Sequence, residues 1–370
     1  MTIALDKRLR ADLRTTGNFS RIHPLPGSSA DVPDDLDARL VVLSITQAHS
    51  READNAAEVA ARTILEYRGN SPRIYRNSLV FLVADKTRVQ DLDAAVRNYL
   101  AWTSILNERE TLDLSPYQVR QAEAQRANAE SVVVARIPET YQWLLVPTQL
   151  TPQVPVTFQA LRLSGPDALA VRASRKLRSD ELLVLSLAPS SLKLELDRIP
   201  LWRGDHVAIR QLIEDFGRYP YLPRLRSVTV LLDAIQAGIN STTWELDSFA
   251  YAEGYDEASG RYRGLRAATI VTLSDADGGL IVKPESAKRQ LDAEAAARRK
   301  REKEKHGGSD TTLPVVDIGP PSTTEITGGG GGSGDTNPIR PLVSSRKLRR
   351  FHGSVTLSAE RAGLDASEIA

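Results

Sequence analysis

The sequence contains no cysteine, no long apolar run and almost no excess of charge of either sign. Without cysteine the chain forms no disulfide and no thiolate metal site, which fits a reducing compartment. No segment reaches the roughly 20 apolar residues of a membrane-spanning helix, and residues 1–20 lack the apolar segment of a signal peptide. With 48 Lys and Arg against 47 Asp and Glu, overall charge favours no anionic partner. We therefore expect a cytoplasmic protein without membrane contact, in which any nucleic-acid contact depends on a local patch.

A phosphate-binding loop is also absent. The pattern G-x-x-x-x-G-K-[ST], whose backbone amides cradle nucleotide phosphates, occurs nowhere in the chain. The glycine run at residues 328–332 contains no lysine and lies in low-complexity sequence. The five histidines are scattered and match no metal-ligand spacing. We therefore expect that this chain alone binds neither ATP with magnesium nor any other cofactor.

Residues 39–106 alternate between two kinds of segment. Residues 39–45 and 78–84 are short apolar runs, as in strands that are buried on both faces. Residues 52–67 and 91–106 carry apolar residues at three- and four-residue steps, which is typical of amphipathic helices. This order of strand, helix, strand and helix predicts a parallel sheet of the α/β class.

Polar and basic residues flank these two predicted strands. In AAA+ ATPases, a strand whose end senses the γ-phosphate is followed by a helix, and then by a loop whose arginine reaches a neighbouring subunit's nucleotide. Here the sensor candidates are Ser44 and Thr46, and the arginine-finger candidates are Arg68, Arg73 and Arg76. The alternative is that these arginines pair with nearby acids or cap the C-terminus of the helix.

Asp85 ends the second apolar run, where a magnesium-binding acid stands in many nucleotide-binding proteins. A second acid does not follow, because the next residue is Lys86. We expect Asp85 to cap the next turn or helix.

The middle of the chain is predicted to be largely helical. Ser115 and Pro116 are a favourable helix start, and a long polar helix follows to about residue 136. Pro138 interrupts this helix, and residues 141–146 are expected to continue it with an apolar face. Residues 147–165 are rich in proline and read as extended. Residues 179–187 fit either a helix leading into a strand or a short buried helix.

Residues 198–266 are rich in aromatic residues and suggest a small winged-helix-like domain. The expected elements are a strand at 199–202, helices at 205–216 and 228–237, β-like runs at 243–251 and 262–265, and a turn at 256–260. Residues 268–273 and 279–283 would extend its sheet. Asp205 is expected to cap the first helix, with His206 in its first turn.

This region could contact nucleic acid. Helix 228–237 would be the recognition helix, but it is apolar and carries no cation, so it is better suited to a core or a protein contact. Backbone contact would come from the nearby arginines, which are Arg203, Arg210, Arg218, Arg224 and Arg226.

The last part of the chain is mostly polar. Residues 286–305 read as a charged helix, and residues 307–341 as a flexible linker that cannot bury a core. Residues 349–357 predict a strand. Asp365 and Glu368 have the spacing of an N-cap and its reciprocal acceptor, so a helix begins just where the sequence stops.

Several stretches together resemble the prokaryotic AAA+-type ATPases that carry domain of unknown function 499 (DUF499). They are RGNSPRIYRNSLVFLVAD (68–85), YLAW (99–102), YQWLLVP (141–147), RIPLWRGDH (198–206), YPYLPRL (219–225), FAYAEG (249–254) and RFHGSV (350–355). The resemblance implies ATP binding by Walker motifs in an N-terminal half, and association with restriction-like and phage-defence genes. This chain lacks that half, so ATP and magnesium are implied only for the intact protein.

The expected architecture is α/β plus α+β. It comprises the C-terminal end of a P-loop or AAA+ core (1–110), a helical lid-like region (111–197), a winged-helix-like domain (198–285), a charged helix with a glycine-rich linker (286–341) and a truncated α+β tail domain (342–370). The leading hypothesis is a C-terminal part of such an ATPase that is inactive alone. The alternatives are a non-enzymatic module that docks onto a separate nucleotide-binding half or a neighbouring subunit, and a DNA-binding regulator.

Overall fold

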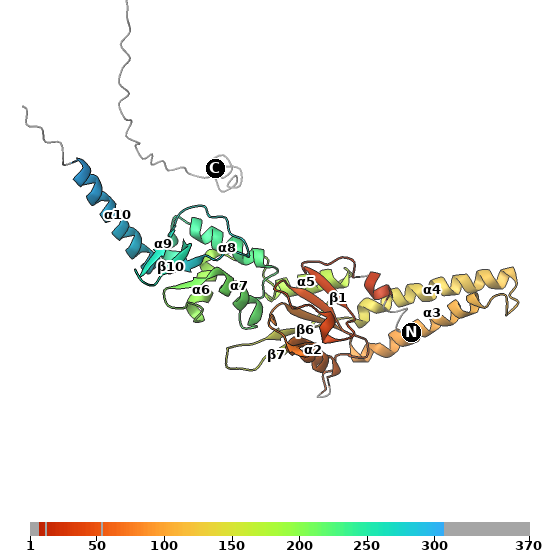
Figure 1. Cartoon of the computed structure of the whole chain (residues 1–370). Helices are drawn as coiled ribbons and strands as arrows, with labels where there is room; N and C mark the ends of the chain where they lie inside the picture. Colours follow the sequence, from red (N-terminus) through yellow and green to blue (C-terminus); the bar gives the residue numbers. More distant parts are fainter. Residues whose placement is uncertain (1–6, 12, 53–54, 307–370) are drawn as a thin grey trace, which may run out of the picture. The chain divides into compact units, whose positions relative to one another are not determined.

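A five-stranded mixed sheet forms the first part of the chain (Figure 1). The computed structural model describes residues 7–11, 13–52 and 55–306, with side chains to residue 304. In spatial order the strands are β1 (Arg21–Pro24), β2 (Arg39–Val42), β5 (Leu79–Val83), β6 (Trp143–Thr148) and β7 (Thr157–Arg162). The first three strands are parallel, and β6 and β7 continue the sheet in antiparallel pairs. The predicted α/β class and its parallel strands are therefore confirmed.

The central strands are apolar because both faces of the sheet are covered. Every residue of β2 and β5 is buried. Helix α2 (Ala56–Glu66) joins these two strands and packs Ala57, Ala61 and Leu65 against one face. The helix leads into a small hairpin of β3 (Tyr67–Arg68) and β4 (Ser71–Pro72). Helix α5 (Leu169–Ser179) and the sheet-proximal ends of α3 and α4 cover the opposite face.

Helices α3 (Val89–Asn107) and α4 (Pro116–Thr140) connect β5 to β6 in the chain and lie side by side (Figure 1). The short 3-10 helix η2 (Lys86–Arg88) precedes α3. The Ser115 side chain accepts a hydrogen bond from Gln118 N, and the Gln118 side chain accepts one from Ser115 N. This capping box, followed by a proline, confirms the predicted helix start.

The expectation that residues 141–146 continue this helix is wrong. The helix passes through Pro138 and ends at Thr140, and the next residues form β6. Residues 143–147 are buried between β5 and β7, so both strand neighbours satisfy their backbone groups. Residues 180–187 form neither a helix nor a strand that belongs to a sheet; only Val184 makes an isolated bridge, to Leu225.

The second part of the described chain combines short helices with a small antiparallel sheet. In chain order its elements are α6 (Pro189–Arg198), β8 (His206–Ala208), α7 (Ile209–Arg218), α8 (Val228–Asn240), α9 (Trp244–Asp247), β9 (Ala250–Ala252), β10 (Gly254–Asp256), β11 (Arg261–Arg263), β12 (Leu280–Val282) and α10 (Pro284–His306). Strand β12 lies between β8 and β9, and β10 with β11 forms a hairpin around the predicted turn.

Several local predictions for this part are corrected. Residues 199–202 form no strand; the strand lies at β8 instead, so Asp205 and His206 do not start a helix. The run at 243–251 begins as helix α9, because Trp244 packs into a cluster with Ala250 and Ala287. Residues 268–273 join no strand, whereas 280–282 do extend the sheet. The predicted helices at 228–237 and 286–305 are present.

The described residues belong to one compact unit. The linker at 307–341 and the tail domain at 342–370 lie outside the described residues. Within the described part, no helix is long and apolar enough to cross a membrane.

Candidate functional site

The sensor candidates and the arginine candidates lie at opposite ends of the parallel strands. Strands β2 and β5 are parallel, with Arg39 beside Leu79 and Val42 beside Leu82. Ser44 and Thr46 follow the carboxyl end of β2, whereas the three arginines precede the amino end of β5. The Ser44 and Thr46 hydroxyl oxygens lie 3.0 Å apart and bond to each other. The structure therefore does not bring the two groups of candidates together within one chain.

The three arginines have different surroundings. The guanidinium of Arg73 is buried and donates to the carbonyl oxygens of Ile64 at 2.8 Å, Val32 at 2.8 Å and Pro33 at 2.9 Å. Burial lowers the pKa of Arg73, although the Asp34 carboxylate 3.7 Å away raises it. These contacts leave the guanidinium facing backbone rather than solvent.

Arg68 and Arg76 are more accessible. Arg68 is exposed on the β3–β4 hairpin, beside a turn in which Gly69 has a φ of 61°. Arg76 is half-buried, and its Nε has no hydrogen-bond partner among the described residues. Of the three candidates, Arg68 presents its side chain most openly to solvent.

Asp85 is the centre of a hydrogen-bonded cluster at the carboxyl edge. Its carboxylate accepts from Thr87 N at 2.9 Å, from Gln142 Nε2 at 2.8 Å and from Trp143 Nε1 at 3.0 Å. Burial alone would raise the pKa of Asp85, but these hydrogen bonds outweigh it and lower the pKa. The expectation that Asp85 caps the next turn is confirmed, because it is the N-cap of η2.

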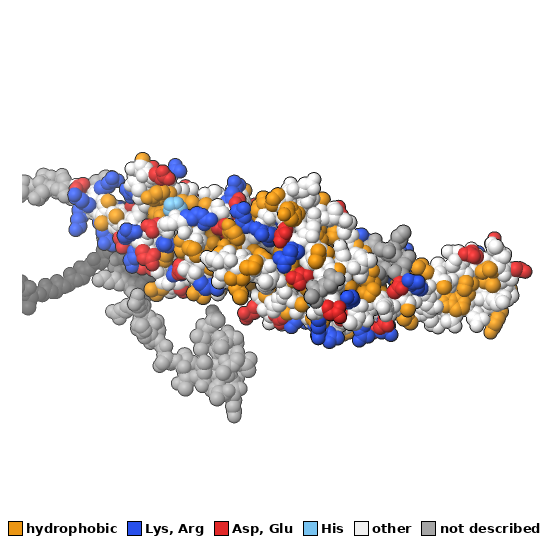
Figure 2. Space-filling view, turned by 90° about the horizontal axis from the view of Figure 1, so that it is seen from below, with side chains coloured by type: hydrophobic (Ala, Val, Ile, Leu, Met, Phe, Trp, Pro, Cys, Tyr) orange, Lys and Arg blue, Asp and Glu red, His pale blue; other side chains and the backbone are white. Residues whose placement is uncertain are grey.

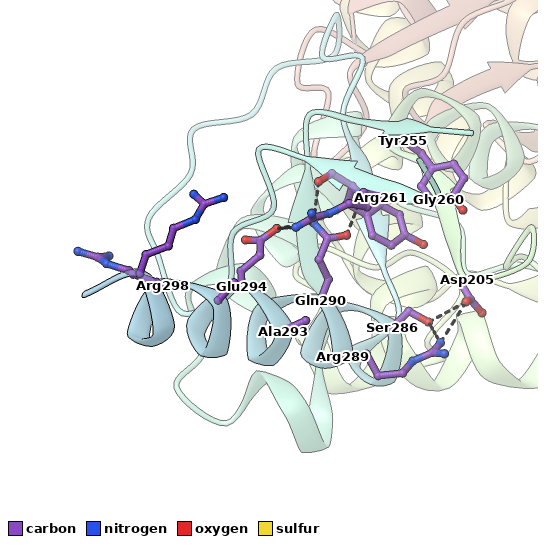
Figure 3. A pocket seen from close by; sticks show the side chains of 13 residues that line it. Asp205, Tyr255, Gly260, Arg261, Ser286, Arg289, Gln290, Ala293, Glu294 and Arg298 are labelled. Carbon is purple, nitrogen blue, oxygen red and sulfur yellow. Dashed lines mark hydrogen bonds and ion pairs between the residues drawn. The ribbon is translucent and has the colours of Figure 1, made fainter. Parts of the chain in front are cut away.

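A groove of about 830 Å³ lies between the β10–β11 hairpin and the face of α10 that runs from Ser286 to Arg301 (Figure 3). The helix residues that line it recur at three- and four-residue steps, so they share one helix face. Small side chains at Ala293 and Ala297 leave the groove open along that face, with Arg298 and Arg301 at its outer end.

Gln290 of α10 holds the β10–β11 hairpin by two hydrogen bonds to its backbone. Its side-chain oxygen accepts from Tyr262 N at 2.8 Å, and its Nε2 donates to Tyr262 O at 2.8 Å. Arg261 of the hairpin also pairs with Glu294 of the helix at 2.8 Å. Nearer the start of α10, Ser286 Oγ donates to Asp205 at 2.7 Å (Figure 3). The groove walls are therefore held in place by direct contacts.

Basic side chains outnumber acidic ones in this groove. Four arginines line it, at 261, 289, 298 and 301, against Asp205 and Glu294. Three of them form ion pairs, because Arg261 lies 2.8 Å from Glu294, Arg289 lies 3.5 Å from Asp205 and Arg298 lies 3.1 Å from Glu302. In the same part of α10, Arg299, Lys300 and Lys303 are exposed, as are Glu302 and Glu304. Figure 2 shows Lys and Arg side chains gathered over the end of the described chain where α10 lies. The local positive charge arises although the whole chain is nearly neutral.

Three aromatic rings form a cluster at one end of the groove, and two of them, Tyr255 and Tyr262, line it. The His206 ring lies 5.0 Å from that of Tyr255 and 5.6 Å from that of Tyr262, and the two tyrosine rings are 4.9 Å apart. Tyr262 is buried, and burial followed by the Asp205 charge raises its pKa to about 12. Tyr255 is 37% exposed and lines the groove. One aromatic side chain is thus presented in the groove, at the end opposite Arg298 (Figure 3).

The outer face of α8 is different in character. Its exposed residues are Thr229, Asp233, Ala237 and Asn240, so it presents one acid and no cation. The helix that would take the recognition position therefore has an exposed face without positive charge, in line with the expectation that it is better suited to a core or a protein contact.

Comparisons of the chain with protein-family models, curated proteins and solved structures find no match. Among the described residues, no group of three or more His, Asp and Glu could hold a metal ion. The groove beside α10 could not be found from sequence, because the hairpin and the helix face that form it are separated in the chain. The only available signal was the arginine and tyrosine content of residues 255–263.

Proposed function

We propose that this chain is the nucleic-acid-binding C-terminal part of an AAA+-type ATPase of the DUF499 family that it resembles. In this proposal the nucleotide site is supplied by a separate N-terminal half or a neighbouring subunit, in the phage-defence setting that the resemblance implies. The observation that carries the proposal is the groove between the β10–β11 hairpin and α10, which is lined by four arginines and two acids.

The element order of the second part supports a winged-helix-like domain as the binding module. Helices α6, α7 and α8 accompany a sheet in which β12 lies between β8 and β9, and the β10–β11 hairpin takes the place of a wing. Because the exposed face of α8 carries Asp233 and no cation, binding is assigned to the hairpin and α10 instead. Arginines that neutralise phosphates give affinity without reading bases.

The test is a salt series of fluorescence anisotropy with labelled oligonucleotides. Replacing Arg298 and Arg301 together with glutamine should weaken binding and reduce the slope of log K against log salt by roughly 1.5. The matched control is Arg109→Gln with Arg120→Gln, two exposed arginines at the far end of the α3–α4 hairpin. Absence of binding to any oligonucleotide at low ionic strength would contradict the proposal.

A second candidate function is favoured by the exposure of Arg68. On the β3–β4 hairpin this arginine is free of the carbonyl contacts that occupy Arg73, and a nucleotide bound to another chain could be reached from it. If a nucleotide-binding partner co-purifies with the chain, Arg68→Ala should lower ATP turnover by the complex and leave complex formation intact. Unchanged turnover would exclude this role.

A further inference from the structure

The groove beside α10 combines two features that duplex binding does not require together. Its arginines can follow a phosphate backbone when Arg261 and Arg298 exchange their partners Glu294 and Glu302 for phosphates. Tyr255 presents an aromatic ring at the same channel (Figure 3). In a duplex the base faces are stacked on one another and are not available to a side chain. In a single strand they are available, and aromatic side chains beside a basic groove are the usual means of holding it.

Tyr255 is positioned for stacking by its neighbours. It lies against His206 at 5.0 Å and Tyr262 at 4.9 Å, and both partners are held in turn. Tyr262 is buried and its backbone is fixed by Gln290, while His206 belongs to β8. The exposed part of the Tyr255 ring therefore has a defined position, which lowers the entropic cost of receiving a base.

The surroundings of the groove also argue against duplex DNA. A duplex bound in the way of a winged-helix domain would place α8 against a base-pair groove and the flanking phosphates. Asp233 on the exposed face of α8 would repel those phosphates, and no cation on that face offsets it. A single strand that follows the hairpin and α10 avoids this face.

Resting on the proposed function, we infer that the groove binds single-stranded nucleic acid, with one base stacked on Tyr255 and the backbone followed by Arg261, Arg298 and Arg301. Affinity is then expected to depend on the presence of bases, and only weakly on their identity, because every base has an aromatic face.

The experiment compares three ligands on the full chain by anisotropy. They are a labelled oligothymidine 20-mer, an abasic strand of the same length, and a duplex of the same length. Stacking predicts that the abasic strand binds roughly five- to hundredfold more weakly than oligothymidine. Because this measurement uses the unaltered protein, it does not depend on whether a variant folds.

Variants then assign the effect to Tyr255. Tyr255→Leu should weaken binding of oligothymidine by a similar factor and leave binding of the abasic strand unchanged, whereas Tyr255→Phe should retain both. The control is Tyr117→Leu, which removes an exposed tyrosine from α4.

The outcomes separate this inference from the function on which it rests. Equal affinity for oligothymidine and the abasic strand, or preference for the duplex, would overturn the single-strand inference while nucleic-acid binding stands. Equal loss of both strands in Tyr255→Leu would overturn the stacking role. No binding of any of the three ligands would overturn the proposed function itself.

Discussion

The side-chain amide of Gln290 exchanges two hydrogen bonds with the backbone of Tyr262, each 2.8 Å long. A side chain on α10 thus pairs with β11 in the way that a neighbouring strand would. The hairpin has only three residues in each strand, and a two-stranded hairpin alone is marginal in water. Its position over the groove therefore depends on this helix.

Replacing Gln290 with alanine should loosen the hairpin. The Tyr262 backbone loses both partners, which we expect to cost about 1–2 kcal/mol and to speed amide hydrogen exchange in residues 254–263. Gln125→Ala, at an exposed position on α4, provides the matched control. Unchanged exchange in the hairpin would show that Gln290 is not needed to hold it.

Arg73 should be required for stability. Lysine keeps the charge but cannot reach the carbonyl oxygens of Ile64, Val32 and Pro33 together, so we expect Arg73→Lys to lower the free energy of unfolding by about 3 kcal/mol. Denaturant titration measures this change. Arg68→Lys on the exposed hairpin should stay within about 0.5 kcal/mol. Equal effects at both positions would contradict the assignment.

His23 should make stability depend on pH. Burial, with the neighbouring charges of Arg39, Arg21 and Arg73, lowers its pKa from 6.5 to about 4. Arg39 also lies 3.1 Å from its Nε2, which favours a neutral ring. As the pH falls, His23 therefore takes up a proton in the unfolded chain at a higher pH than in the folded chain. The free energy of unfolding that His23 contributes above pH 6.5 is lost as the pH falls toward 4.

The expected loss is about 1–2 kcal/mol, less than the full pKa shift implies because the ring is partly open to solvent. Urea titrations at pH 7.5 and pH 4.5 measure it, and His23→Asn should reduce the difference between them. The pKa of His49 is also lowered by burial, so His49 contributes in the same direction. It should account for part of the pH dependence that is left in His23→Asn. A variant with the same pH dependence as the original chain would exclude His23 as a source.

Asp85→Ala should destabilise the carboxyl edge of the sheet. It would leave the Gln142 amide and the Trp143 indole N–H without their acceptor, at a cost of about 2 kcal/mol. Asp233→Ala, at an exposed site on α8, should have little effect. Thermal melting of both variants checks the difference, and equal melting temperatures would contradict the role of the cluster.

The purified chain alone should not hydrolyse ATP, because it has no phosphate-binding loop. Phosphate release measured with and without magnesium should equal the background, and Arg76→Ala should not change it. Turnover that disappears in Arg76→Ala would contradict this expectation.

Periodicity was sufficient to predict β2, α2, β5 and α3, because each is a long or strongly patterned segment between turns. It failed at residues 141–146, since an apolar run that is buried on both faces has the same composition in a strand as in a core helix. The Asp85 cluster needed the fold as well: Gln142 and Trp143 reach it only because β6 lies beside β5. The groove at α10 depends on a hairpin and a helix face whose contact no local pattern encodes.

The buried guanidinium of Arg224 joins the sheet to the helices beyond it. It donates to Asn77 O at 2.6 Å and Pro147 O at 2.7 Å, and burial lowers its pKa to about 10. Asn77 in turn donates to Phe216 O at 2.9 Å. If the chain were divided at residue 197, where composition changes, the C-terminal fragment would keep Arg224 but lose its acceptors Asn77 O and Pro147 O. Neither fragment should then express as a well-folded protein, and heat should unfold both regions in one cooperative transition.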